Sequence, residues 1–90
     1  MEILKDRIAK DEELAFYVEE ERKRLMLAEK IRQARRESGL SQKEVAKRIG
    51  TTQSAIARLE SGSYERLSLN TLIKVTRALN RRLSLEILPV

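Results

Sequence analysis

A tight corner at Gly50 and Thr51 limits the folds open to this chain more than any other stretch of its sequence. It separates two short segments that both carry helix-start signals. Ser41 opens the first segment, and Glu44 at the third position completes a capping box. Thr52 is placed to cap the second segment. Only a tight turn fits between them, and glycine supplies the unusual backbone angle that it needs. The sequence therefore predicts two short helices held at a fixed angle.

Apolar spacing defines the buried sides of these helices and predicts another helix after them. The first segment buries Val45, Ala46 and Ile49, and the second buries Ala55, Ile56 and Leu59 before it closes at 61–63. Ser68 is placed to cap a further helix that ends at Asn80, a residue that tolerates the left-handed conformation. Its apolar residues are Leu69, Leu72, Ile73, Val75 and Leu79.

The N-terminal part is also expected to be helical, because it contains no Gly or Pro before Gly39. Asp11 is a plausible N-cap, and Gly39 fits a left-handed C-cap. The pattern leaves open whether one long helix or two cover this stretch. The apolar stripe changes face near Glu21–Leu25, where Glu21 interrupts it, and this favours two helices with a bend.

The C-terminal part alternates apolar and polar residues, which predicts one short strand over Leu83–Leu88, stopped by Pro89. A lone strand cannot satisfy its own backbone hydrogen bonds. We expect it to pair with Met1–Lys10, with a second copy of the chain or with a partner. Because the strand could pair with a second copy of the chain, it is our first candidate for a dimer interface.

The composition argues against an enzyme. The chain has 90 residues, enough for one domain with a small core, and it contains no Cys and no His. Thiolate nucleophiles and the commonest general base and metal ligand are therefore missing. Carboxylates occur in charged runs beside Lys and Arg. We expect no catalytic residues, no metal and no cofactor. The scarcity of aromatic residues also argues against a single-strand-binding surface.

No stretch approaches the ~18 apolar residues of a membrane span. Charges throughout the first ten residues exclude a signal peptide. A cytoplasmic protein without a membrane partner is expected.

Charge divides the chain into two unequal parts. Residues 1–24 hold six basic and eight acidic side chains, whereas residues 25–90 hold thirteen basic and six acidic ones. The net charge of the whole chain is +5. A basic body with an acidic arm suggests two different partners. Solvated helix faces with no partner are an equally good interpretation of charge alone.

The second short helix carries the residue types that read DNA. Its outward residues are Gln53, Ser54, Ala57 and Arg58. Glutamine can pair with adenine and arginine with guanine in a major groove ~12 Å wide. This face is therefore a candidate for recognition of duplex DNA.

Residues 40–62, LSQKEVAKRIGTTQSAIARLESG, closely resemble the Cro/repressor (Xre-type) helix-turn-helix family, and the resemblance extends from about Ala28 to Leu88. It implies an all-α, lambda-repressor-like domain of about five helices over residues 25–90, with a short C-terminal β-strand. Residues 1–24 would form an acidic helical extension. The resemblance also implies a homodimer that represses transcription on palindromic double-stranded operator DNA.

The resemblance assigns roles position by position. The second short helix would be the recognition helix. Gln42 would bind a phosphate and brace this helix, and Thr52 would cap it close to a phosphate. Arg35 and Glu60 would form a structural ion pair. Bases would be faced by Gln53, Ser54 and Arg58, and further candidates for DNA contact are Lys43, Tyr64 and Arg66. Lys43 is also well explained as part of a solvated helix face, and Tyr64 by packing against its loop.

The extension and the C-terminal strand together resemble HigA-type antitoxins in pattern. That resemblance implies an antitoxin that represses its own operon and neutralises a basic ribonuclease toxin of the RelE superfamily, a HigB-like protein. The partner-binding residues would be Leu14, Phe16, Tyr17 and Val18, among six acidic residues between Asp11 and Glu21. Packing of this helix on its own domain or on a sister subunit, or disorder, are alternatives. A free-standing regulator without a toxin and a protein-bridging module are the competing functions.

Overall fold

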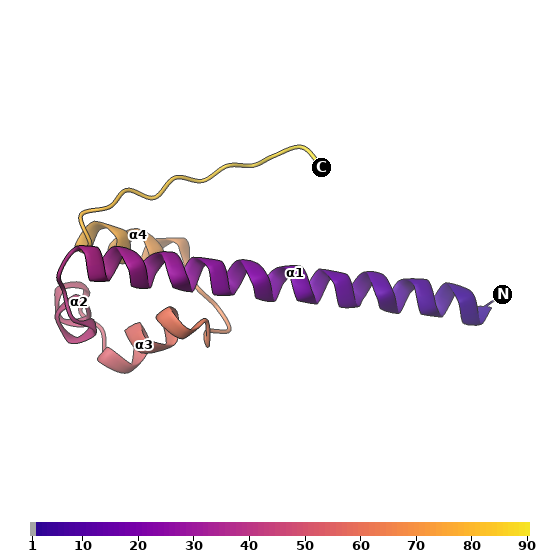
Figure 1. Ribbon diagram of the computed structural model, residues 1–90, viewed down its shortest axis with the longest axis horizontal. Helices are drawn as coiled ribbons and strands as arrows, with labels where there is room; N and C mark the ends of the chain where they lie inside the picture. Colours follow the sequence, from indigo (N-terminus) through magenta and orange to yellow (C-terminus); the bar gives the residue numbers. More distant parts are fainter. Residues whose placement is uncertain (1) are drawn as a thin grey trace.

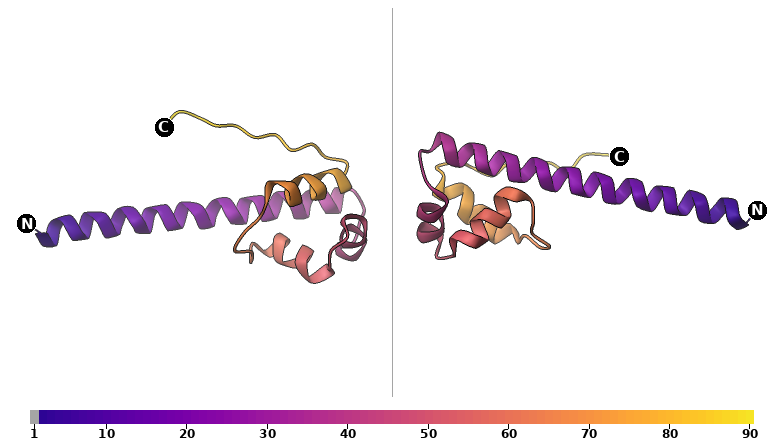
Figure 2. Two further views of the ribbon diagram at one scale, coloured as in Figure 1. Left: turned by 180° about the vertical axis from the view of Figure 1, so that it is seen from behind. Right: turned by 60° about the horizontal axis from the view of Figure 1, so that its bottom comes forward.

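The computed structural model describes the backbone of residues 2–90 and the side chains of residues 12–15 and 17–90. It contains four helices: α1 (Glu2–Glu37), α2 (Gln42–Ile49), α3 (Gln53–Ser61) and α4 (Leu69–Ala78). The last three helices gather at the C-terminal end of α1, and the N-terminal half of α1 extends well beyond them (Figure 1). The molecule is accordingly elongated, with extents of 57 × 29 × 20 Å. Figure 2 shows the same arrangement from behind and from below.

The expectation of two N-terminal helices with a bend near Glu21–Leu25 is wrong. α1 is one helix of 36 residues, and it begins at Glu2 rather than after Asp11. With no Gly or Pro in this stretch, nothing interrupts the backbone hydrogen bonds. A shift of the apolar stripe does not require a bend, because Leu14 and Val18 in this half of the helix are exposed, so their burial does not demand one.

Local signals position the short helices as the sequence indicated. Ser41 and Glu44 form the complete capping box, and the hydroxyls of Thr52 and Ser68 accept hydrogen bonds from the third backbone N–H of α3 and α4. Gly50 ends α2 in the left-handed conformation, with φ 74° and ψ 38°. The corner between α2 and α3 is therefore set by the backbone of a single glycine.

One small core joins the four helices. Ile31 of α1 packs with side chains from α2, α3 and α4, and Val75 at its centre is fully buried. Burial of these side chains supplies most of the stability that such short helices cannot obtain alone. The buried members of this core are Ile31, Val45, Ala46, Ile56, Leu59, Leu72, Val75 and Leu79.

The predicted strand is not formed, and four helices replace the expected five. α4 ends at Ala78, Asn80 adopts a left-handed φ of 54°, and residues 81–90 follow without a strand anywhere in the described range 2–90. This segment runs back in the direction of the N-terminus of α1 (Figure 1). Pairing with Met1–Lys10 is wrong as well, because residues 2–10 are helical. Leu83 packs against the core, whereas Leu85 and Ile87 are exposed.

Candidate nucleic-acid interface

Helix α3 presents a polar outer face and a buried inner one. Ile56 and Leu59 point into the core, and Glu60 beside them is only 4% exposed. Ser54 and Arg58 lie on the opposite side and are exposed, as is Gln53 in the first turn. The half-buried Ala57 lies between them, so nothing bulky separates the polar side chains. This face offers amide, hydroxyl and guanidinium groups to a partner.

An ion pair fixes the C-terminal end of α3 to α1. The Arg35 guanidinium donates from Nε and Nη2 to the two carboxylate oxygens of Glu60, at 2.6 and 2.9 Å. Its third nitrogen, Nη1, donates to the Leu40 carbonyl at 2.8 Å. The hydrogen bonding with Glu60 raises the pKa of Arg35, its charge adds to that effect, and burial opposes it. The pair therefore stays charged and holds three segments together.

Gln42 extends this network from the first turn of α2. Its side-chain Nε2 donates to Glu60 Oε1 at 3.3 Å, and the residue is half-buried. The contact braces α3 against α2, which is one of the two roles the resemblance gave it. Lys43, the next residue, is exposed. Thr52 is exposed too, and its hydroxyl accepts the capping bond from the Ala55 N–H at 3.1 Å.

The structure places Tyr64 against α1. Its ring lies under the Arg24 guanidinium, with 5.6 Å between the guanidinium carbon and the ring centroid, and its hydroxyl donates to the Arg24 carbonyl at 3.5 Å. Burial raises the pKa of Tyr64, and the charge of Arg24 opposes that shift. Sequence reasoning missed the role of Arg24, because 40 residues separate it from its partner. The ring still lines a hollow that it shares with Arg58 and Arg66.

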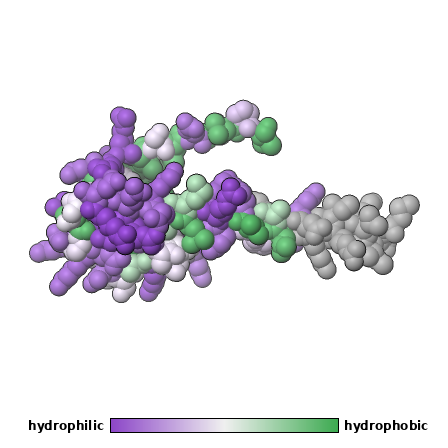
Figure 3. All heavy atoms as spheres, viewed as in Figure 1, coloured by the Kyte–Doolittle hydropathy of each residue, from purple (hydrophilic) through white to green (hydrophobic). Residues whose placement is uncertain are grey.

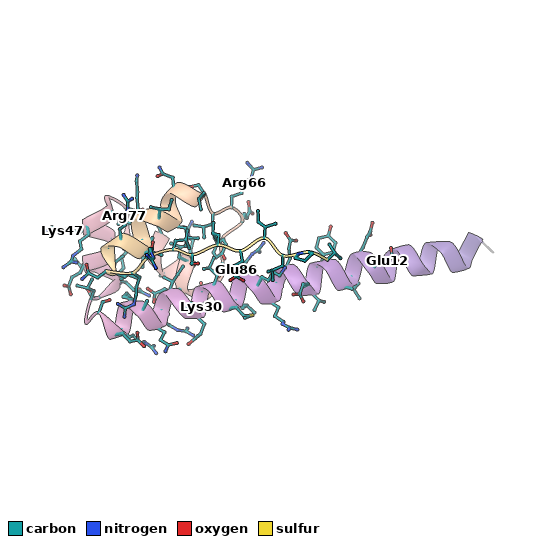
Figure 4. All side chains as sticks on the ribbon, turned by 90° about the horizontal axis from the view of Figure 1, so that it is seen from above. Glu12, Lys30, Lys47, Arg66, Arg77 and Glu86 are labelled. Atoms are coloured by element: carbon teal, nitrogen blue, oxygen red, sulfur yellow. The ribbon has the colours of Figure 1, made fainter. Side chains whose placement is uncertain are left out.

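Exposed basic side chains also lie elsewhere on the domain. Lys47 and Arg66 lie at opposite sides of the domain, and Glu12 lies on α1 away from the domain (Figure 4). Arg48 makes a contact within the domain, because its Nη1 donates a hydrogen bond to the Ala78 carbonyl at the end of α4, at 3.3 Å. The sequence carried no signal for that contact. Glu60, on the buried side of the same helix, is paired with Arg35.

The predicted partner-binding residues lie on the projecting part of α1. Leu14, Tyr17 and Val18 are 62–66% exposed, and the Phe16 side chain lies outside the described residues. Within the described part of the chain, no group of acidic side chains is arranged to hold a metal ion. Over the same residues, no helix is long and apolar enough to cross a membrane.

Comparison with known proteins identifies the fold of this site. A model of the helix-turn-helix family matches residues 31–85, which is more than half of the chain. An uncharacterized HTH-type transcriptional regulator of Methanothermobacter thermautotrophicus is 45% identical over 51 residues, which cover 57% of this chain and 72% of that protein. The outer part of α1 lies outside the family match. The chain belongs to the Xre/Cro-type helix-turn-helix family of DNA-binding transcriptional regulators, a family of non-enzymatic proteins.

Proposed function

We propose that this chain is a sequence-specific repressor that inserts α3 into the major groove of an operator. The observation that carries the proposal is the rigid mounting of α3, whose outer polar face is exposed while Glu60 ties its inner side to Arg35. A helix held in this way can offer side chains to base edges without first becoming ordered. Repression follows when the bound protein occupies the promoter.

Base contacts are assigned to the exposed side chains of α3. The Gln53 amide suits the N6 and N7 edge of adenine, and the Arg58 guanidinium suits O6 and N7 of guanine. Ser54, on the same side of the helix as Arg58, can donate to or accept from either base. These contacts would select the operator, because phosphates carry no sequence information.

Phosphate contacts are assigned to the residues around the corner. Gln42 and Thr52 stand at the N-terminal ends of α2 and α3, where backbone N–H groups favour an anion. Lys43 and Arg66 are exposed and add positive charge on either side. Tyr64 is assigned a smaller part, since Arg24 and α1 already cover it. We also propose that two copies bind a palindromic site together, with half-sites about 34 Å apart.

The test begins with selection of a preferred duplex from random sequences by the full-length chain. Arg58→Ala is then expected to weaken binding to the selected duplex by about 1–3 kcal/mol, with a much smaller effect on random DNA. Arg77→Ala is the matched control, because it removes the same charge from an exposed position on α4. Equal losses on both DNAs would assign Arg58 to a phosphate. Failure to shift any duplex would favour a protein-bridging module instead.

A narrower proposal is that the repressor is also the antitoxin of a basic ribonuclease of the RelE superfamily. The exposed apolar and acidic side chains of the outer part of α1 support it, since acidic groups would speed and orient binding to a cationic RNA-binding surface. Co-expression with the product of an adjacent gene tests this proposal. A stable complex that loses ribonuclease activity is expected. A chain with no such neighbour would be a free-standing regulator.

A further inference from the structure

An exposed apolar edge runs along α1 beyond the DNA-binding domain. Leu14, Val18 and Leu25 are 66%, 62% and 50% exposed, and they follow one another at heptad spacing, with Glu21 at the intermediate position. Green surface marks this part of α1 in Figure 3. A shallow hollow along the edge is lined by Val18, Arg22, Leu25 and Met26. Spacing of four and three residues is typical of a helix that packs against another helix.

We propose that this edge, defined by Leu14, Val18, Glu21 and Leu25, pairs with the same edge of a second copy, and that the two helices run antiparallel. The charge of α1 supports this occupant. Residues 11–21 hold six acidic and no basic side chains, whereas residues 22–32 hold five basic and one acidic. An antiparallel pair brings the acidic half of each helix to the basic half of the other. A parallel pair would bring the acidic halves together.

The apolar residues define the register. Leu14 of one copy meets Leu25 of the other when the two-fold axis passes between Glu19 and Glu20. In this register Glu21 faces Val18 of the second copy, whereas a parallel pair would place two copies of Glu21 opposite each other at the seam. The basic toxin of the narrower proposal above would compete for the same edge of α1. It would satisfy only the acidic half of α1, so the charge pattern favours the second copy.

The same pairing places both DNA-binding domains on one side. The edge lies about a quarter of a turn around α1 from the buried Ala28 and Ile31, at roughly 100° per residue. The two-fold axis stands perpendicular to the plane of the paired helices, so it is nearly parallel to the direction in which each domain projects. Both copies of α3 therefore face the same way.

The spacing of the two α3 helices follows from the rise of α1. The C-terminal part of α3 and its cap lie against α1 between Leu25, which adjoins Gly62, and Arg35, which binds Glu60. The middle of that span is about ten residues from the two-fold axis, or roughly 16 Å at ~1.5 Å per residue. Twice this distance along the helix and the sideways offset of paired helices, ~8–10 Å, are perpendicular to each other, so as the two sides of a right triangle they give a separation of about 33 Å. One turn of duplex DNA is ~34 Å.

Cysteine cross-linking tests the orientation, since the natural chain contains no Cys. Leu14→Cys and Leu25→Cys chains, purified separately and then mixed under oxidising conditions, are expected to form the mixed disulfide-linked dimer. Leu14→Cys alone is expected to stay uncross-linked, because its two copies would lie about 16 Å apart, beyond disulfide reach. Efficient cross-linking of Leu14→Cys alone would mean a parallel pair and overturn the proposal.

Sedimentation velocity tests the edge itself. Leu14→Glu with Val18→Glu is expected to raise the dimer dissociation constant by about tenfold or more, because two charges enter an apolar seam. Lys23→Glu makes the same change in net charge on the opposite side of α1 and is expected to have little effect. A wild-type chain that stays monomeric at its highest soluble concentration would overturn the proposal. The proposal would also be overturned if Leu14→Glu with Val18→Glu weakened binding to a basic partner but left the dimer dissociation constant unchanged.

Only the consequence for DNA spacing depends on the proposed repressor function. Cross-linking without DNA tests the helix pair, and selection of half-sites one turn apart tests the use made of it. If the chain forms the mixed cross-link but binds no duplex DNA, the repressor function is refuted and the helix pair stands. Absence of the mixed cross-link in a chain that still binds its operator would refute the pair alone.

Discussion

Glu60→Ala tests the anchoring of α3 most directly. The carboxylate is 4% exposed and accepts hydrogen bonds from Arg35 at 2.6 and 2.9 Å and from Gln42 at 3.3 Å. Its removal leaves the Arg35 guanidinium, whose side chain is 14% exposed, without its counter-charge. Deleting one partner of a buried pair costs about 3–5 kcal/mol. Because Arg35 keeps its bond to the Leu40 carbonyl, we expect a loss near the lower limit, about 3 kcal/mol.

Urea and thermal unfolding followed by circular dichroism measure this loss. In a domain of this size 1 kcal/mol shifts Tm by roughly 4–8 °C, so Glu60→Ala should lower Tm by roughly 12–24 °C. Arg81→Ala is the control. It breaks the Arg81–Glu37 bridge at 3.0 Å, whose side chains are 44% and 54% exposed, and should cost at most about 1 kcal/mol. A loss for Glu60→Ala no larger than that of the control would refute the reasoning.

A second variant separates the stranded charge from the loss of contacts. Arg35→Met combined with Glu60→Leu replaces the pair by apolar side chains of similar volume, which is often neutral for stability. We therefore expect the double variant to be more stable than Glu60→Ala alone. If it is equally unstable, packing around Glu60 rather than the uncompensated charge accounts for the effect.

Three further outcomes are expected. Gly50→Ala should cost about 1–2 kcal/mol in urea unfolding through backbone strain alone, since a Cβ there meets no atom within 4 Å at φ 74°; Gly50→Asn should cost less, and equal losses would contradict this. Because burial raises the pKa of Tyr64 above its ordinary 10.0, the folded state holds that proton more tightly. Its contribution to stability is complete below about pH 10 and is lost as pH rises through the folded pKa. Tyr64→Phe should therefore lose less stability than the wild type across that range. Parallel curves of unfolding free energy against pH for the two proteins would count against the raised pKa of Tyr64. Operator affinity should fall roughly 10³–10⁵-fold between about 50 and 200 mM salt, if 6–10 phosphates are contacted; a flat response in fluorescence anisotropy would exclude a DNA interface of this kind.

The sequence by itself determined the features that arise within a few residues. The caps at Ser41, Thr52 and Ser68 are hydrogen bonds to a backbone N–H three positions later, so residue type and spacing were enough to predict them. The same holds for Gly50, whose left-handed conformation follows from its place between two helices. The inward faces of α2 and α3 followed from helical periodicity.

Contacts between distant residues were decided by the tertiary structure. Tyr64 lies on Arg24, 40 positions away, and Arg48 binds the end of α4, 30 positions away. Gln42 joins the Arg35–Glu60 pair from a third helix. No local pattern encodes such a partner, because many surface residues of the same type are compatible with the same spacing.

The wrong expectations of a bend in α1 and of a C-terminal strand have a shared physical reason. Alternating residues at Leu83–Leu88 describe what each face of a strand would prefer, but a strand also needs a neighbour to accept its backbone hydrogen bonds, and this chain provides none in residues 2–90. The changing stripe near Glu21 describes which side of α1 is apolar, but only packing could bend the helix there. Local chemistry thus determined the elements of the DNA-binding core, whereas the presence or absence of a packing partner decided the length of α1 and the state of the C-terminal segment.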